Sequence, residues 1–229
     1  LGREKLDEVY ARVFGAERAL VRTQFVSGTH ALAAVLFGLL RPGDRLVSIT
    51  GTPYDTMQTV IGWAHESCGS LKEFGVSYDE LPLREGHVDL DSIAHVMTPE
   101  TKIALVQRSR GYSEREPLSI ADIRAVSARI KAANPNCIVF VDNCYGEFVE
   151  TEEPTAIADV DIMAGSLIKN PGGGLAPTGG YIVGRSDLVE AASYRLTAPG
   201  MGDELGASLI SNRLLFQGLF LAPHVVAQA

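Results

Sequence analysis

Short apolar runs alternate with longer segments of helical periodicity along the whole chain, and this alternation limits the possible fold more than any other feature. Several of the apolar runs have no polar face, as expected for strands that helices cover on both sides. Such a succession favours an α/β fold with a mostly parallel central sheet flanked by helices. We expect one continuous domain over residues 1–229, because no repeat or Pro/Ser-rich linker interrupts the pattern.

The same pattern predicts where the individual elements lie. The expected strands are Ala19–Arg22, Arg45–Ile49, Phe74–Leu81, Ile103–Gln107, Ile138–Val141, Asp161–Ala164 and Tyr181–Val183. The expected helices are Leu6–Phe14, His30–Leu40, Thr56–Gly62, Leu90–Met97, Ile120–Ala133, Leu188–Tyr194 and Gly206–Phe220.

Composition argues against several classes of function. The formal net charge of −8 and the lack of a Lys/Arg cluster disfavour a nucleic-acid-binding surface. Three scattered cysteines are too few for a disulfide framework, so a reduced, cytoplasmic protein is the simplest interpretation. The longest apolar stretch, Ala31 to Leu40, is too short to cross a bilayer, and no signal peptide precedes it. No histidine pairs with another at metal-ligand spacing, so no metal site is expected.

A lysine and an aspartate follow two of the predicted strands. Asp142 ends the apolar run Ile138–Val141, and Lys169 follows the next strand, with Ser166 before it and a glycine run behind it. Pyridoxal phosphate (PLP) needs these two groups: a lysine that holds its aldehyde as a Schiff base, and an acid that keeps its pyridine nitrogen protonated. Most lysines are solvated surface charges, so the prediction for Lys169 rests on its position.

Two further segments could bind the phosphate and the ring of such a cofactor. Ser27-Gly28-Thr29 directly precedes an apolar helix, where hydroxyls and amide donors can face an anion, although a plain helix cap has the same sequence. Tyr54 follows a strand and could stack on a planar heterocycle or pack in a turn. Tyr145 could reach the phenolic oxygen of PLP or could simply pack against the protein.

Arginines and glycines supply weaker signals. Arg108 and Arg110 follow another strand, and an arginine fork matches the two oxygens of a carboxylate, so a substrate carboxylate, the cofactor and a surface salt bridge are all compatible partners. The run Gly172–Gly174 resembles a phosphate loop but lacks the spacing of dinucleotide and nucleotide fingerprints, which disfavours an NAD or ATP site.

In their order, these motifs resemble the large domain of fold-type-I PLP enzymes over nearly the whole chain. The more specific strings are Phe25-Val26-Ser27-Gly28-Thr29-His30-Ala31, Arg108-Ser109-Arg110-Gly111-Tyr112, Val141-Asp142-Asn143-Cys144-Tyr145-Gly146-Glu147-Phe148 and Lys169-Asn170-Pro171-Gly172-Gly173-Gly174. They are similar to a bacterial group known as methionine gamma-lyase-like, cystathionine beta-lyase-like or aluminium-resistance proteins.

The resemblance implies a role for each matching residue. Lys169 would carry the aldehyde of PLP, Asp142 would pair with the pyridine nitrogen, and Tyr54 would stack on the ring. The phosphate would be held by Gly28, Thr29 and Ser166. No arginine follows Lys169 closely, which departs from the aminotransferase pattern. The resemblance also implies that residues 1–229 form the large domain without the N-terminal arm and C-terminal small domain, and that the protein assembles as a homodimer or homotetramer.

Three functions agree with these features. The first is a PLP-dependent carbon–sulfur lyase that acts on cystathionine, cysteine or methionine by removal of the α proton and elimination of a thiol. The second keeps PLP but performs transamination or aldol cleavage. The third is a non-catalytic scaffold of the same fold, which Lys169 and Asp142 argue against because a scaffold needs neither.

Overall fold

A computed structural model describes residues 2–63, 68–204, 208 and 210–229, and the chain forms two compact units. Unit 1 comprises Leu1–Leu39, Asn143–Ala158 and Ile162–Ala229; unit 2 comprises Leu40–Asp142 and Asp159–Asp161. Within the described ranges, no helix is both long enough and apolar enough to cross a membrane. The prediction of a single continuous domain stays a prediction.

Unit 2 contains a parallel sheet in which β2 lies between β3 and β4, and β4 lies between β2 and β5. Its strands are β2 (Arg45–Ser48), β3 (Ser77–Glu80), β4 (Thr101–Gln107) and β5 (Ile138–Asp142), and its helices are α3 (Asp55–Ile61), α4 (Ile93–Val96) and α5 (Ile120–Ala133). Every residue of β5 is buried, which explains why this strand lacks a polar face in the sequence. Helix α5 begins at a capping box in which Ser119 and Asp122 satisfy each other's backbone amides.

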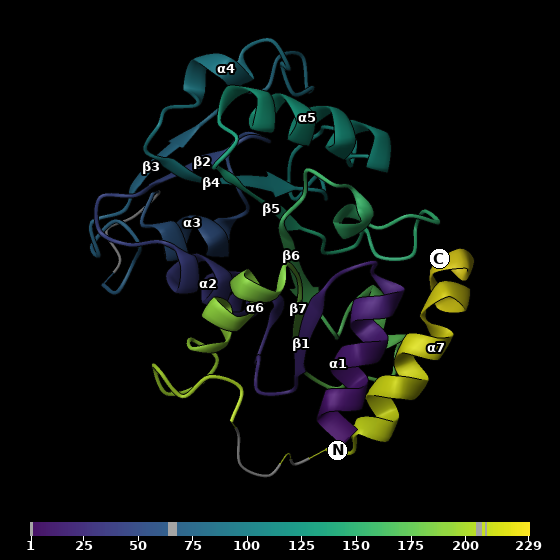
Figure 1. Cartoon of the computed structure of the whole chain (residues 1–229). Coiled ribbons are helices and arrows are strands. Elements are labelled where there is room, and N and C mark those ends of the chain that lie inside the picture. The colour runs from purple at the N-terminus through teal and green to yellow at the C-terminus, as the bar shows by residue number, and fades with distance from the viewer. Residues whose placement is uncertain (1, 64–67, 205–207, 209) are drawn as a thin grey trace. The chain divides into compact units, whose positions relative to one another are not determined.

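Unit 1 contains a sheet in which β7 runs antiparallel to both of its neighbours, β1 and β6. Its elements are α1 (Gly2–Val13), β1 (Arg18–Arg22), α2 (Gly28–Leu39), β6 (Ile162–Ser166), β7 (Gly180–Gly184), α6 (Ser186–Ser193) and α7 (Asn212–Gln228), with short 3₁₀ turns at Pro154–Ala156 and Asn170–Gly172. Helices α1 and α7 lie side by side, as Figure 1 shows.

Different helices cover the two faces of this sheet, because neighbouring residues of β7 point in opposite directions. Tyr181 lies against Tyr10 of α1, with ring centroids 6.2 Å apart, and stacks on Phe14, which directly follows α1, at 5.3 Å. A Cβ at Gly180 would instead lie 3.0 Å from Ala31 of α2. On that second face α2 packs closely against α6, since a Cβ at Gly38 would lie 2.8 Å from the Cα of Ala192.

The predicted elements all have counterparts in the structure, and α5 has the predicted bounds. Strand β3 begins at Ser77 rather than Phe74, because Gly75 has a φ of +81° and closes a turn onto Lys72. Helix α7 begins at Asn212 and continues past the predicted end at Phe220, and Ser211 caps its first turn. The earlier part of that predicted helix includes residues 206, 207 and 209, which lie outside the described residues.

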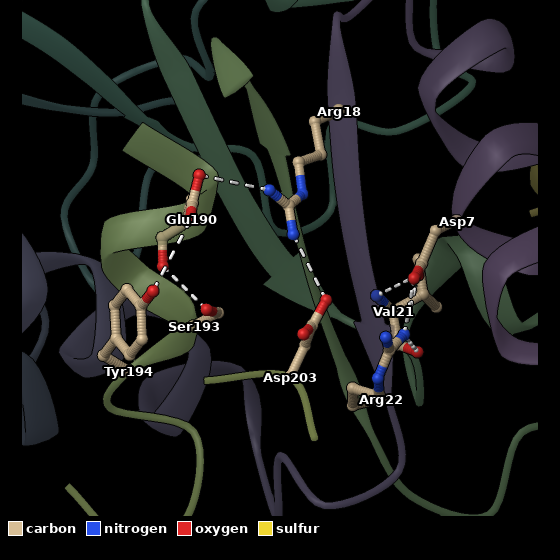
Figure 2. Close-up of polar contacts among 8 residues, drawn as sticks. All are labelled: Asp7, Arg18, Val21, Arg22, Glu190, Ser193, Tyr194 and Asp203. Atoms are coloured by element: carbon tan, nitrogen blue, oxygen red, sulfur yellow. Dashed lines mark hydrogen bonds and ion pairs between the residues drawn. The ribbon is translucent and has the colours of Figure 1, made fainter. Parts of the chain in front are cut away.

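Two arginines of the edge strand β1 form ion pairs with other elements of unit 1, as Figure 2 shows. Nη1 of Arg22 lies 2.7 and 2.8 Å from the two carboxylate oxygens of Asp7 on α1. The backbone amide of Val21 donates to the same carboxylate at 2.8 Å. Arg18, more exposed, contacts Asp203 at 3.2 Å and Glu190 at 3.6 Å. The contacts of Asp7 hold α1 against the sheet edge from which the chain continues towards α2.

The Asp7 carboxyl should make stability depend on pH. Burial raises its pKa to about 6, and this loss of hydration outweighs the opposing charge of Arg22. The folded protein binds the Asp7 proton more tightly than the unfolded chain does. This difference contributes its full stabilisation below the unfolded pKa, and the contribution is lost as the pH rises through the folded pKa. We therefore expect the unfolding free energy to fall by on the order of 2 kcal/mol between about pH 4 and pH 6.5. Asp7→Asn should remove this slope in denaturant titrations, whereas Asp203→Asn, which removes only the smallest contribution to the raised pKa of Asp7, should retain most of it.

Candidate active site

Lys169 lies in a tight turn directly after β6. Leu167 is fully buried and anchors the turn, while Ile168 is exposed and Lys169 is half-buried. The amide of Lys169 donates to the carbonyl of Ser166, and the amide of Gly172 donates to the carbonyl of Lys169 at 3.1 Å. The backbone on both sides of Lys169 is therefore fixed, as the chemistry of a positioned amine requires.

The glycine run that follows Lys169 allows neighbouring backbone segments to pack closely. A Cβ at Gly172 would lie 1.8 Å from the carbonyl oxygen of Leu167. Gly173 has a φ of +52°, and a Cβ there would lie 2.3 Å from the carbonyl oxygen of Gly218 on α7. The run thus lets the Lys169 turn and α7 meet backbone to backbone. The signal for this contact in the sequence was Gly218, a glycine in the interior of a helix.

Tyr145 lies against the amine of Lys169. The Nζ atom is 4.0 Å from the centroid of the Tyr145 ring, which is a cation–π contact. Tyr145 has a φ of +68°, a left-handed conformation that is uncommon for a residue other than glycine, and its side chain is 62% exposed. The structure thus brings together two of the predicted site residues through the face of the ring.

The start of α2 lies close to the end of β6. A Cβ at Gly28 would lie 3.0 Å from the Cβ of Ser166 and 3.4 Å from Sγ of Cys144, so glycine allows the helix to approach β6 closely. The hydroxyl of Ser166 is buried, and among the described residues it has no hydrogen-bond partner. A buried unpaired hydroxyl near the N-terminus of a helix fits the phosphate of PLP, which would accept its proton.

Ser27 and His30 have local roles at the same helix end. The hydroxyl of Ser27 accepts a hydrogen bond from the amide of His30 at 3.1 Å, so Ser27 caps α2. The amide of Val26 donates to Nδ1 of His30, and burial lowers the pKa of His30 below its usual value. His30 is therefore a neutral acceptor at this helix start. Thr29 is half-buried in the first turn of α2.

Unit 2 holds the other predicted residues around the ends of β4 and β5. Asp142 is buried at the end of β5, and its carbonyl accepts a hydrogen bond from the amide of Arg108 at 3.0 Å. The amide of Tyr54 donates to Oε1 of Gln107 at 3.2 Å. Gln107 is a residue that sequence reasoning missed; it ends an apolar strand just as Asp142 does, which was the available signal.

The two predicted arginines differ in their surroundings. Arg108 is buried, and its Nε donates to the carbonyl of Leu118 at 3.3 Å. Arg110 is exposed. A third arginine, Arg115, is buried and donates to the backbone carbonyls of Gln107 and Ser109, so it supports the loop that carries the other two. A substrate-binding role for Arg108 and Arg110 stays a prediction.

Sequence comparisons relate the whole chain to one family. The profile of the family described as methionine gamma-lyase matches residues 1–229. The uncharacterized protein YnbB of Bacillus subtilis is 53% identical over 231 residues, which cover 100% of this chain and 55% of that protein. L-methionine gamma-lyase of Pseudomonas deceptionensis is 28% identical over 214 residues, which cover 91% of this chain and 47% of that enzyme. The chain thus spans about half the length of the curated relatives that it matches.

Structural comparison confirms the predicted fold class. A Listeria monocytogenes protein, provisionally named a cystathionine beta-lyase involved in aluminum resistance, matches with a TM-score of 0.96 and 56% identity. The match covers 100% of this chain and 56% of that one. The α/β fold with a mostly parallel sheet flanked by helices, and with it the large-domain architecture that the resemblance implied, is therefore confirmed.

Proposed function

The chain belongs to the methionine gamma-lyase family, and from this membership we propose that it is the cofactor-binding part of a PLP-dependent carbon–sulfur lyase. The proposed substrate is a sulfur-containing amino acid such as cystathionine, cysteine or methionine. Because the chain spans about half the length of its curated relatives, the activity is proposed for the whole protein.

One observation carries the proposal: the buried hydroxyl of Ser166 has no hydrogen-bond partner in the described part of the chain. A buried donor without a partner destabilises a fold by about 1–3 kcal/mol, so an acceptor from outside the chain gives it a physical reason to be there. Ser166 is the residue of β6 that Gly28 approaches most closely, and Lys169 follows it in the turn after the strand. The proposal therefore places the phosphate of PLP at the start of α2 and its aldehyde at Lys169.

The proposed chemistry assigns two proton positions to side chains of this chain. When bound, PLP supplies an electron-poor ring that takes up the electron pair left when a substrate C–H bond breaks. Nζ of Lys169 would hold the aldehyde of PLP and, once the amino group of the substrate has displaced it, would accept the α proton. The sulfur group would leave as a thiolate with the electron pair of its bond to carbon, and the proton held on Nζ would balance that charge to give the thiol. Asp142, a buried acid, keeps the pyridine nitrogen protonated.

Other residues bind and orient in this proposal. Gly28, Thr29 and Ser166 hold the phosphate, and Ser27 contributes by capping the helix that carries the first two. Tyr54 covers the pyridine ring, with its backbone held by Gln107. These residues supply orientation, which lowers the entropic part of the barrier.

The activity is tested with the full-length protein and PLP. Cysteine, cystathionine and methionine are supplied separately, and the release of a thiol and of a 2-oxo acid is followed. The proposal predicts both products from at least one of the three substrates. A 2-oxo acid without a thiol, formed only when an amino acceptor is present, would replace the lyase by an aminotransferase. Neither product from any substrate would reject the lyase function.

Ser166→Ala should weaken PLP binding. The variant removes one hydrogen bond to a doubly charged phosphate, so we expect the dissociation constant for PLP to rise about tenfold or more. Equilibrium dialysis of the full-length protein measures this constant directly. Ser127→Ala is the matched control, because Ser127 is also buried but donates to the carbonyl of Arg124. An equal loss of affinity in both variants would contradict the role of Ser166.

A further inference from the structure

A fully buried glutamate that the proposed chemistry does not use lies close to the Lys169 turn. Glu147 has no exposed surface, and the tyrosine that binds it, Tyr181, packs in turn against the rings of Tyr10 and Phe14. Burial of a carboxyl group is costly unless other groups bind it. The contacts of Glu147 therefore indicate what it holds in place.

Glu147 contacts two separate elements of unit 1. The hydroxyl of Tyr181 on β7 donates to Oε1 of Glu147 at 2.6 Å. The side-chain amide of Asn170 donates to the backbone carbonyl of Glu147 at 2.9 Å. Burial and the nearby Glu147 raise the pKa of Tyr181 well above its usual value, so Tyr181 stays a donor. One buried residue thus connects β7 to the residue that follows Lys169.

Strand β6 has a glycine where the side chains of Tyr181 and Glu147 meet. A Cβ at Gly165 would lie 2.6 Å from the hydroxyl of Tyr181 and 2.7 Å from Oε1 of Glu147. Gly165 directly precedes Ser166, so the carboxyl group lies against the strand that carries the proposed phosphate ligand. The absence of a side chain at Gly165 is what leaves room for the hydrogen bond.

The segment around Glu147 needs such an anchor. Tyr145 and Phe148 both have left-handed backbones, with φ of +68° and +62°, a conformation that is unfavourable for residues other than glycine. Glu153 binds the two ends of this segment: it accepts from the side chain of Asn143 at 2.9 Å and from the amide of Phe148 at 2.7 Å. Glu147 fixes the middle of the segment, two residues after the ring that contacts Lys169.

We propose that Glu147 is a positioning residue: through Tyr181 and Asn170 it holds the Tyr145 ring against the amine of Lys169. The proposal rests on the proposed function only in treating Lys169 as the amine that reacts with an aldehyde. Glu147 acts on that amine through the loop that carries Tyr145 and through the turn that carries Lys169.

The test measures the reactivity of Lys169 in the full-length protein without cofactor. Lysines are labelled with trace acetic anhydride across a range of pH, and mass spectrometry compares the acylation rate of Lys169 with those of the exposed Lys72 and Lys102. The aromatic face favours the charged amine, so its loss should raise acylation of Lys169 roughly threefold at a pH where most of the amine is protonated. Tyr145→Leu removes the ring, so the rise in Lys169 acylation in this variant is the reference for the other variants.

Two tyrosines in one aromatic cluster provide the matched pair of variants. Tyr181→Phe removes the hydroxyl that binds Glu147 and should give the same rise as Tyr145→Leu. Tyr10→Phe should give none, because the hydroxyl of Tyr10 has no hydrogen-bond partner among the described residues. Glu147→Gln keeps an oxygen that accepts the hydrogen bond from Tyr181, so its Lys169 should be acylated at the wild-type rate.

A double variant separates positioning from general loosening. In the Tyr145→Leu background, Tyr181→Phe should add nothing, because the ring through which it acts is gone. The proposal is overturned if folded Tyr181→Phe leaves Lys169 acylation unchanged, if Tyr10→Phe has the same effect, or if the double variant is additive. Failure of PLP to attach to Lys169 would reject the proposed function, yet this dependence of amine reactivity on Tyr181 would stand.

Discussion

Lys169→Ala should abolish the lyase activity of the full-length protein, with a loss in kcat of about 10³-fold or more. In the proposed mechanism the same Nζ atom holds the aldehyde and accepts the α proton, and positioned acid–base groups alone contribute about 10²–10⁴-fold. The release of thiol from the best substrate, measured with saturating PLP, gives the loss in rate. Saturation matters because it separates the loss of the proton acceptor from a loss of cofactor.

The matched control is Lys102→Ala, which removes an exposed lysine on β4. This variant should keep full activity. If Lys169→Ala retained more than about a tenth of the rate, the proton would be accepted elsewhere, since a change this small lies below the range for an acid–base group. An equal loss in both variants would indicate a general effect of charge.

The second large effect concerns stability. Gly173→Ala should lower the unfolding free energy by about 3 kcal/mol or more, because the new methyl group meets the carbonyl oxygen of Gly218 at 2.3 Å and the residue has a left-handed backbone. The displaced turn carries Lys169, so attachment of PLP should weaken in the same variant. Thermal unfolding and PLP dialysis measure the two consequences.

Gly174→Ala is the control one residue away. Gly174 also has a left-handed backbone, with a φ of +73°, but a Cβ there meets nothing within 4 Å. This variant should lose only about 1–2 kcal/mol from backbone strain. The difference between the two variants isolates the contact between the Lys169 turn and α7, and equal losses would show that this contact contributes nothing.

Much of the fold could be predicted from local pattern alone. Strand β5 is an unbroken apolar run, and α5 begins with a serine cap and keeps its apolar period to its end, so both were predicted to within a residue. Element ends were missed where a single backbone conformation decides them. Gly75 closes a turn inside the predicted β3, and Ser211 caps α7, which begins at Asn212 rather than at the predicted position.

The candidate site also combines residues that the local sequence predicts with contacts that it does not. Lys169, Ser166 and Gly28 were predicted because they stand at the ends of strands and at the start of a helix, which are local features of the sequence. The contact of the glycine run with Gly218 and the hydrogen bond from Tyr181 to Glu147 join residues far apart in the chain. No pattern within a short window contains that information, so these contacts required the structure.

The proposed function depends above all on the attachment of PLP to Lys169, which chemical trapping can reveal. The full-length protein is saturated with PLP, reduced with borohydride and digested, and the peptides are mapped by mass spectrometry. We expect a reduced pyridoxyl phosphate group on the peptide that contains Lys169, and none on that peptide when Lys169→Ala is treated in the same way. A label on another lysine, or no stable label on folded protein, would show that Lys169 is not the attachment point.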